Sequence, residues 1–534
     1  MEYFVLGIGG TGMRCIESFI HLCAMGMLDD TTVHLLALDT DKNNGNFARL
    51  KAVKDAYLNV KDLDSSNRTT GKDCFFSANL KYYEFSPNYE QKSTFKDVFG
   101  YDDTHYNNRN ASDLADLVFS GDVEEFNLRH GYRAQTHLGS MMMYHSIIEA
   151  AQSDFNNDLK RFLQSLIAAS SNGKPRVFIL GSVFGGTGAS SIPISPQAIA
   201  KAAGIISKGA SNVMQNAYFG STLLTAYFKF NLPSATERKE QKIIATSDKF
   251  ALNSQVAMMF YQDDATVQAT YQKFYMIGTP GMDWDPMPQK TESGAKTITG
   301  GSEQKNDSHY IELFAACAAL DFLKVEEDVL QTNKTNKKAD YQYRSINDNG
   351  KIEFQDFVGQ ARAEEFAKKM SMLTILSILC NNPVYDFVSS LQNGAAKISG
   401  FEDVNPEQIK NLKDYFALYH FKAGGDDVLS EGWLRQLHRS AGGSDKFLFA
   451  AEMFAPQTVK EQTKSDWNQP FRNEGVCRDN GFSVKLFGNK YDKIKENFLK
   501  IYDGKDDMSV SSSTNRHEQM LKRIYDTLIS VYKF

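Results

Sequence analysis

Residues 3–12 have the sequence YFVLGIGGTG, an apolar run that leads directly into a glycine-rich turn. Residues 13–27 then carry apolar side chains at helical spacing, and the apolar run 33–38 ends in Asp39-Thr40-Asp41. A buried strand, a glycine turn, a helix and a second buried strand form a βαβ unit with a parallel sheet. The first 41 residues therefore predict an α/β fold.

The glycine turn fits the pattern GxGxxG from Gly7 to Gly12, between a strand and a helix. Glycines there let the backbone approach a phosphate, and the helix N-terminus supplies N–H groups and partial positive charge. Asp39 follows at about the distance where a dinucleotide-binding fold places its ribose-binding acid. By itself this motif indicates a Rossmann fold. The alternative is a tight turn in which glycine only permits positive φ.

A second glycine loop changes this interpretation. Residues 176–181 predict another buried strand, the loop 184–190 reads FGGTGAS, and a helix to about residue 203 follows. Two such turns on one sheet can hold one polyphosphate from two sides, whereas a dinucleotide fold does not need the second. Further strands are expected at 217–230 and 273–278. Residues 309–325 are apolar on nearly every face, which predicts a helix buried all round.

Together, these motifs resemble those of the tubulin/FtsZ superfamily. The strand-GxGGxG-helix pattern is matched by VLGIGGTGMRCIES (5–18), the second loop xxNTDxQ by LLALDTDKNN (35–44), and the signature GGGTGTG by FGGTGAS (184–190). The match covers roughly residues 1–325. Phe184 replaces the first glycine of the signature, and Asp39 stands where FtsZ has asparagine, so the chain resembles a divergent bacterial branch.

The resemblance implies a Rossmann-like parallel-sheet GTPase domain, a long buried central helix and a smaller α+β C-terminal domain. We expect the nucleotide-binding domain at 1–305, with an insertion of helices and loops at about 45–130 on the sheet's edge. The central helix is expected at 306–325 and the C-terminal domain at 326–502. A linker and an amphipathic helix are expected at 503–534.

The resemblance also implies binding of GTP or GDP with Mg²⁺. Asp39 and Asp41 would lie near the phosphates, with Asp41 the best candidate to hold the metal. A solvated strand end is the plainer alternative for these acids. The two glycine loops would supply the other phosphate-binding positions, namely Gly9, Gly10, Thr11, Gly12 and Met13 in the first, and Gly185, Gly186, Thr187 and Gly188 in the second.

Three further segments take roles from the family's order of elements. The loop 130–140 would face the γ-phosphate with Arg133, unless it is an ordinary surface loop. The aromatic segment 226–238 would lie near the ribose. At the start of the central helix, Asn306 and Glu312 would read the guanine, although Asn306 or Asp307 could simply cap that helix. Glu312 stands in an apolar run and would need a partner if buried.

Hydrolysis in this superfamily is completed across a head-to-tail subunit contact by an acidic loop. Glu353 and Asp356 in KIEFQD (351–356) fall on the two acids of the family's NxDFxxD pattern. Residues 341–357 instead alternate with the period of two that is typical of a strand, and Asn349-Gly350 is a typical turn. Both features favour an exposed β-hairpin. In that case the catalytic loop is missing or lies elsewhere, and hydrolysis would be slow or absent.

Composition sets broader limits. The 534 residues are 42% hydrophobic and 23% charged, with a net charge of −6, which is ordinary for a globular protein and argues against one that coats nucleic acid. The six cysteines form no CxxC pair, and no secretion signal is seen, so we expect a cytoplasmic protein. The helix at 517–534 could dock on a partner, a membrane surface or the next subunit, or pack on its own domain; a membrane anchor is not favoured.

Three functions compete. The first is a tubulin-like GTPase that self-assembles head-to-tail, in a cytoskeletal, membrane-remodelling or defence role. The second is a nucleotide-binding interaction module without turnover, and the third is a Rossmann dinucleotide enzyme.

Overall fold

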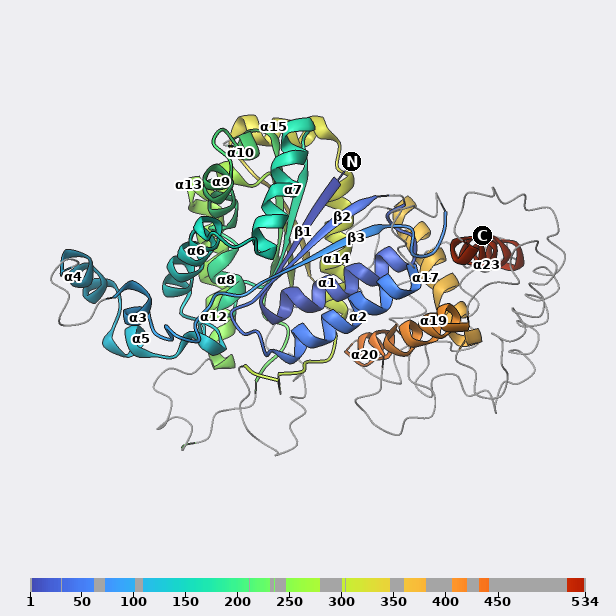
Figure 1. The fold of residues 1–534 in the computed structure, drawn as a ribbon, viewed down its shortest axis with the longest axis horizontal. Coiled ribbons are helices and arrows are strands. Elements are labelled where there is room, and N and C mark those ends of the chain that lie inside the picture. Colours follow the sequence, from blue (N-terminus) through green and yellow to red (C-terminus); the bar gives the residue numbers. More distant parts are fainter. Residues whose placement is uncertain are drawn as a thin grey trace.

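A computed structural model gives the fold of the chain (Figure 1). It describes residues 2–29, 31–61, 73–100, 109–210, 212–230, 235, 246–278, 300–302, 304–345, 360–380, 406–419, 432–440 and 516–532. Glu353 and Asp356, the two expected catalytic acids, lie outside these residues.

The described residues form one seven-stranded sheet in which all pairings are parallel. Its strand order is β3-β2-β1-β4-β5-β6-β7, so the chain builds outward from β1 in both directions. A parallel sheet is covered on both faces, which explains the continuous apolar strands. The strands are β1 Glu2–Ile8, β2 Thr32–Leu38, β3 Asn79–Phe85, β4 Arg176–Leu180, β5 Tyr218–Leu224, β6 Lys273–Gly278 and β7 Asp340–Ser345.

One face of the sheet packs against the glycine-loop helix and the central helix. Val5 of β1 enters this core together with apolar residues from the C-terminal helices. The central helix α14 is buried on nearly all sides, as its sequence predicts. The helices on this side are α1 Gly9–Ala24, α2 Gly45–Lys61, α14 Tyr310–Lys324, α17 Gln360–Cys380, α19 Pro406–Tyr419, α20 Trp433–Ser440 and α23 Arg516–Tyr532.

The alternate residues of β1, Phe4, Leu6 and Ile8, enter a second core on the opposite face. The helices that contribute to this core pack against each other and against the sheet (Figure 1). The second face therefore completes a three-layer α/β architecture. Its main helices are α6 Thr136–Gln152, α7 Asp158–Asn172, α9 Ser195–Ile206, α10 Asn212–Asn216, α12 Phe250–Asp263 and α13 Ala265–Thr270, with α8 Thr187–Ser191 at the carboxyl end of β4. The helix α15 Glu327–Asn336, which follows the central helix, contributes Leu330 to the first core.

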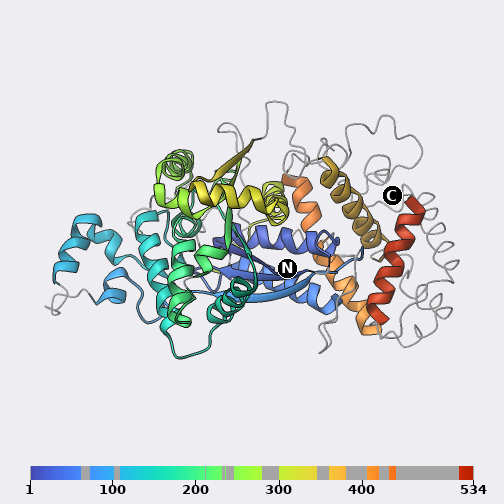
Figure 2. The ribbon, with the colours of Figure 1, turned by 90° about the horizontal axis from the view of Figure 1, so that it is seen from above.

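Two parts lie at opposite ends of the long axis of the molecule. Helices α3 Phe95–Phe99, α4 Arg109–Val118 and α5 Gly121–Glu125 project at one end (Figure 1). At the other end, α23 lies beside α17 (Figure 2). Its predicted apolar face is covered within the chain, since Leu521, Ile524 and Leu528 are fully buried and Tyr525 packs edge-on against Phe75. This arrangement matches the expectation of a helix packed on its own chain.

Two strands differ from the sequence-based expectation. β3 lies within the segment 45–130, so that segment adds an edge strand to the sheet as well as helices. Residues 340–345, expected from 341 onward as the first arm of a hairpin, form β7 and pair in parallel with β6. The sheet thus continues past residue 325. None of the described helices is long and apolar enough to cross a membrane.

Candidate functional site

A pocket opens where β1, β2 and β4 end and their following loops meet. In open parallel sheets, ligands bind in this position, outside the carboxyl ends of the strands at the point where the strand order reverses, which here lies between β1 and β4. The pocket encloses about 790 Å³ of space, which includes the open solvent at its mouth. Its described lining includes most of the residues expected from sequence: Gly9, Gly10, Thr11, Asp39, Asp41, Arg133, Gly185, Gly186, Thr187, Gly188 and Asn306.

The first glycine loop brings the N-terminus of α1 to the pocket. Gly9 has φ +71°, a conformation that glycine adopts without the penalty of a side chain. A Cβ on Gly12 would lie 2.6 Å from the carbonyl carbon of Gly7 and 2.7 Å from the carbonyl oxygen of Leu180, so this glycine lets helix and sheet approach. α1 has no side-chain cap and no acidic residue in its first turn, which leaves its N–H groups available to an anion.

The second glycine loop faces the first across the pocket. A Cβ placed on Gly9 would lie 3.4 Å from Cβ of Thr187 and 3.6 Å from the nitrogen of Gly188. The two glycine loops are therefore close neighbours, and both border the pocket. The five-residue helix α8 begins at Thr187, so this loop also turns directly into helical backbone.

A third loop, 131–134, closes over the second. A Cβ on Gly186 would lie 3.0 Å from the backbone nitrogens of both Arg133 and Ala134. Arg133 and Ala134 have φ +45° and +63°, and consecutive non-glycine residues in this region are uncommon and strained. Such strain is typical of ligand-contacting loops. The loop therefore lies beside the second glycine loop, with Arg133 on the pocket wall.

The two acids of this site have different surroundings. Asp41 accepts hydrogen bonds at its carboxylate from the backbone N–H groups of Asn43 and Gly301, which ties the loop around residue 301 to β2. Asp39 is 3% exposed, and its Oδ2 atom has no hydrogen-bond partner among the described residues. Burial, together with the neighbouring charge of Asp41, raises the pKa of Asp39 to about 7. An acid with this environment in a cleft is a typical functional group.

The donor set suits Mg²⁺, which binds through one or two carboxylates plus substrate phosphates and retained waters. Asp39 and Asp41 could supply those carboxylates. Among the described residues, no group of three or more His, Cys, Asp or Glu side chains could hold a metal by itself. Any Mg²⁺ here would therefore depend on the phosphates of the ligand.

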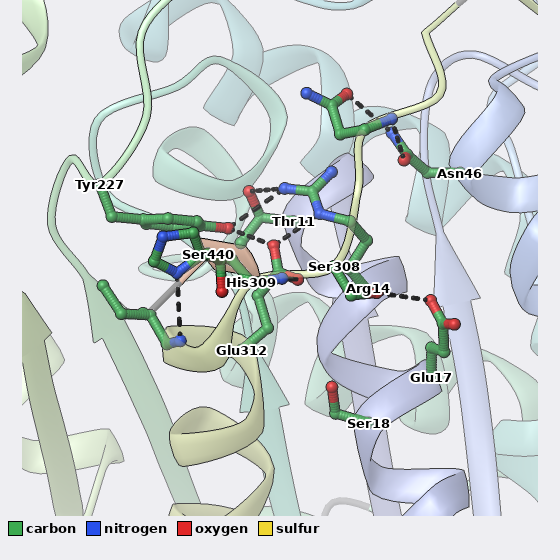
Figure 3. A network of polar contacts seen from close by, with 12 residues as sticks. Thr11, Arg14, Glu17, Ser18, Asn46, Tyr227, Ser308, His309, Glu312 and Ser440 are labelled. Atoms are coloured by element: carbon green, nitrogen blue, oxygen red, sulfur yellow. Dashed lines mark hydrogen bonds and ion pairs between the residues drawn. The ribbon is translucent and has the colours of Figure 1, made fainter. Parts of the chain in front are cut away.

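Arg14, which sequence reasoning missed, lines the pocket from the second turn of α1 (Figure 3). Its Nε donates to Oε1 of Glu312 at 2.5 Å, and its NH2 donates to the hydroxyl of Tyr227 at 3.1 Å. Burial disfavours the charged guanidinium, but Glu312 and Tyr227 outweigh this and raise the pKa of Arg14 above its usual value. The pocket therefore has a fixed positive charge in its wall. The sequence indicated that Glu312 needs a partner if it is buried, but it could not identify Arg14 as that partner.

Glu312 itself does not line the pocket, which corrects its expected role as the guanine-reading acid. It is fully buried, with Oε1 taken by Arg14 and Tyr227 and Oε2 accepting from the backbone N–H of His309. Glu312 and His309 form a capping box at the start of α14, so His309 is the N-cap rather than Asn306 or Asp307. Gly12 and Met13 are also buried behind the pocket wall.

Amide side chains gather at the end of the pocket near α14. Asn306 lines this end, and its backbone N–H donates to Oδ1 of Asn46 at 3.1 Å. Asn44 donates to Oε1 of Gln304 at 2.7 Å. Amides can donate and accept at once, which suits the edge of a base. Asn44 and Gln304 were not singled out from sequence.

Four phenylalanines form an aromatic wall in the pocket: Phe184, Phe228, Phe230 and Phe250. Phe184 lies 4.9 Å from Phe250 and 5.2 Å from Phe228 between ring centroids. Phe228 and Phe230 belong to the segment expected near the ribose. Phe184 stands where the family's signature has glycine. It therefore adds an aromatic side chain to the pocket wall at a position where glycine would present only backbone.

Comparison with known proteins does not identify this chain. No protein-family model matches it, and no curated protein matches it either.

Proposed function

We propose that this pocket binds a nucleoside triphosphate with Mg²⁺, and that GTP is the nucleotide. The observation that carries the proposal is the convergence of three backbone loops and two carboxylates on one pocket, whose polar end has amides and whose wall has phenylalanines. The loops suit phosphates, the acids suit a phosphate-bound Mg²⁺, and the amides with the aromatic rings suit a base. The preference for GTP rests on the resemblance to the tubulin/FtsZ superfamily.

On the same resemblance, we propose that the chain assembles head-to-tail and hydrolyses GTP at the subunit junction. A contact of this kind does not close and generates filaments. Glu353 and Asp356 remain the candidate acids for the junction, although they lie outside the described residues.

The test is GTP turnover with Mg²⁺ over a range of protein concentrations, with ATP as the control nucleotide. Specific activity that rises with protein concentration supports a site shared between subunits. Binding of GTP with activity that is absent or independent of concentration would contradict the assembly model and favour a binding module. Failure to bind GTP would reject the proposal as a whole.

A dinucleotide-binding function is the second candidate, because the strand order 3-2-1-4-5-6 of the first six strands is also that of dinucleotide-binding folds. Asp39 at the end of β2 stands where such folds bind the ribose. The mass of the ligand released from the purified protein separates the two candidates, since a dinucleotide and a nucleoside triphosphate differ in mass.

A further inference from the structure

Helix α12 presents an apolar stripe to solvent. Leu252, Val256, Met259 and Phe260 are 60%, 57%, 64% and 43% exposed. Their spacing of four, seven and eight residues from Leu252 places them on one face of the helix. Single exposed apolar residues are ordinary, but a continuous stripe of large ones indicates an interaction surface.

The two charged residues centred on this face have opposite signs and lie at its two ends, while the exposed Asp248 lies at its edge. Lys249 precedes the first turn and Asp263 is the last residue of the helix; both are exposed, and neither forms an ion pair with another described residue. At 100° per residue, both fall on the same face as the apolar stripe. Lys249 lies seven residues before Val256, and Asp263 lies seven residues after it.

We propose that α12 is the contact surface of a symmetric dimer, in which it packs antiparallel against α12 of a second copy of this chain. The two-fold axis passes at Val256. Lys249 of each copy then lies opposite Asp263 of the other, and Leu252 lies opposite Phe260. The charge pattern is the reason for choosing a second copy of α12 as the binding partner. In an antiparallel pair, each lysine lies opposite an aspartate, whereas a parallel pair would place lysine opposite lysine.

This contact differs from the head-to-tail assembly proposed above. A symmetric contact uses the same patch on both copies and closes after two, so it makes dimers and cannot extend a filament. Two helices of this length bury less surface than an obligate dimer does, which places the contact among the small, transient interfaces. The inference does not depend on the nucleotide.

Cross-linking tests the register. In a Cys477→Ser background the remaining native thiols, at positions 15, 23, 74, 317 and 380, are buried. Val256→Cys should then form a disulfide-linked dimer on mild oxidation, at least tenfold more than Leu117→Cys, an apolar position on α4 that is even more exposed than Val256. Leu252→Cys and Phe260→Cys proteins should cross-link with each other when mixed but not each with itself, because positions 252 of the two copies stand about 12 Å apart along the helix.

Charge reversal provides an independent measurement. Lys249→Asp and Asp263→Lys should each weaken the dimer in sedimentation equilibrium, and the double variant should restore it, because the pairs re-form with exchanged signs. Cross-linking at Val256 no greater than at Leu117, self-cross-linking of Leu252→Cys, or a double variant as weak as the single ones would overturn the proposal. Far-UV circular dichroism confirms that each variant is folded.

Discussion

Nε of Arg14 lies 2.5 Å from Oε1 of Glu312, and both side chains are almost completely buried. The pair joins the glycine-loop helix to the central helix across 298 positions of sequence. Because Arg14 also lines the pocket, the ion pair both holds the fold together and fixes a charge at the site.

Replacing Glu312 by alanine should destabilise the protein by about 3–5 kcal/mol, because it leaves the buried charge of Arg14 without its partner. Urea denaturation measures the change. The double variant Arg14→Met with Glu312→Leu removes both charges and should recover most of the lost stability. An unchanged denaturation midpoint for Glu312→Ala would show that the ion pair is not formed.

Gly12→Ala should destabilise by at least about 1–3 kcal/mol, since the added methyl group would meet backbone atoms of Gly7 and Leu180 that cannot move independently. The matched control is Gly204→Ala, within α9, where a Cβ meets nothing within 4 Å. That control should be neutral or stabilising by about 0.5–1 kcal/mol, because glycine is unfavourable inside a helix. Thermal melts compare the two; equal effects would refute the close approach at Gly12.

Asp39→Asn should raise the stability of the ligand-free protein, and more so at pH 8 than at pH 5. The pKa of Asp39 rises from 3.8 to about 7 on folding, mainly through burial. Between these values the folded chain holds the proton more tightly, so ionisation of Asp39 lowers stability as the pH rises. Above pH 7 the gain for asparagine should reach about 1–4 kcal/mol. Melting curves at both pH values measure it.

The control for Asp39 is Asp41→Asn. Asp41 accepts backbone hydrogen bonds from Asn43 and Gly301, so its replacement should destabilise at both pH values. Both variants should weaken Mg²⁺-dependent nucleotide binding if the acids face the metal. A stability gain for Asp39→Asn that is the same at pH 5 and pH 8 would show that the carboxyl group does not titrate there.

His309→Asn should flatten the loss of stability in acid. Burial, assisted by the nearby charge of Arg14, lowers the pKa of His309 from 6.5 to about 3. Between these pH values, His309 is protonated in the unfolded chain but not in the folded chain. The free energy of unfolding therefore falls as the pH drops from 6.5 towards 3. This group contributes up to about 1.4 kcal/mol per pH unit. Asparagine keeps the capping acceptor without titrating.

Denaturation midpoints of the His309→Asn protein and the wild type between pH 7 and pH 4 measure this slope. Loss of the packing of the His309 ring against Tyr310 lowers stability equally at every pH. The prediction is therefore tested by the slope of stability against pH and not by the stability at one pH. Parallel curves for the two proteins would contradict the prediction.

Much of the sheet could be predicted because a buried strand followed by a glycine loop is a local signal. Expected strands at 33–38, 176–181 and 273–278 match β2, β4 and β6 closely. β3 was missed because its polar and aromatic residues alternate without a continuous apolar run. β7 was read as a hairpin arm because Asn349-Gly350 is a strong local turn signal, whereas the parallel pairing with β6 is set by distant residues.

The candidate site also has some positions that local motifs predict and others that depend on distant residues. Backbone-lined positions such as Gly9 and Gly186 follow from motifs, and the structure brings them to one pocket. Arg14 could not be assigned, because its role depends on Glu312 and Tyr227, which are distant in sequence. The aromatic wall arises from three separate segments, and each phenylalanine alone resembles an ordinary core residue.

The helix α1 is enclosed on both sides, by the sheet and by the C-terminal helices. Trp433 donates to the hydroxyl of Ser18, and Tyr415 contacts Nδ1 of His21 at 2.6 Å. A fragment ending after β7 would retain every described strand and the whole described lining of the pocket, yet it would expose this polar and aromatic side of the glycine-loop helix to water. The fragment that a domain diagram would suggest cloning is therefore not an autonomous unit, and the order of its glycine loop depends on residues far downstream.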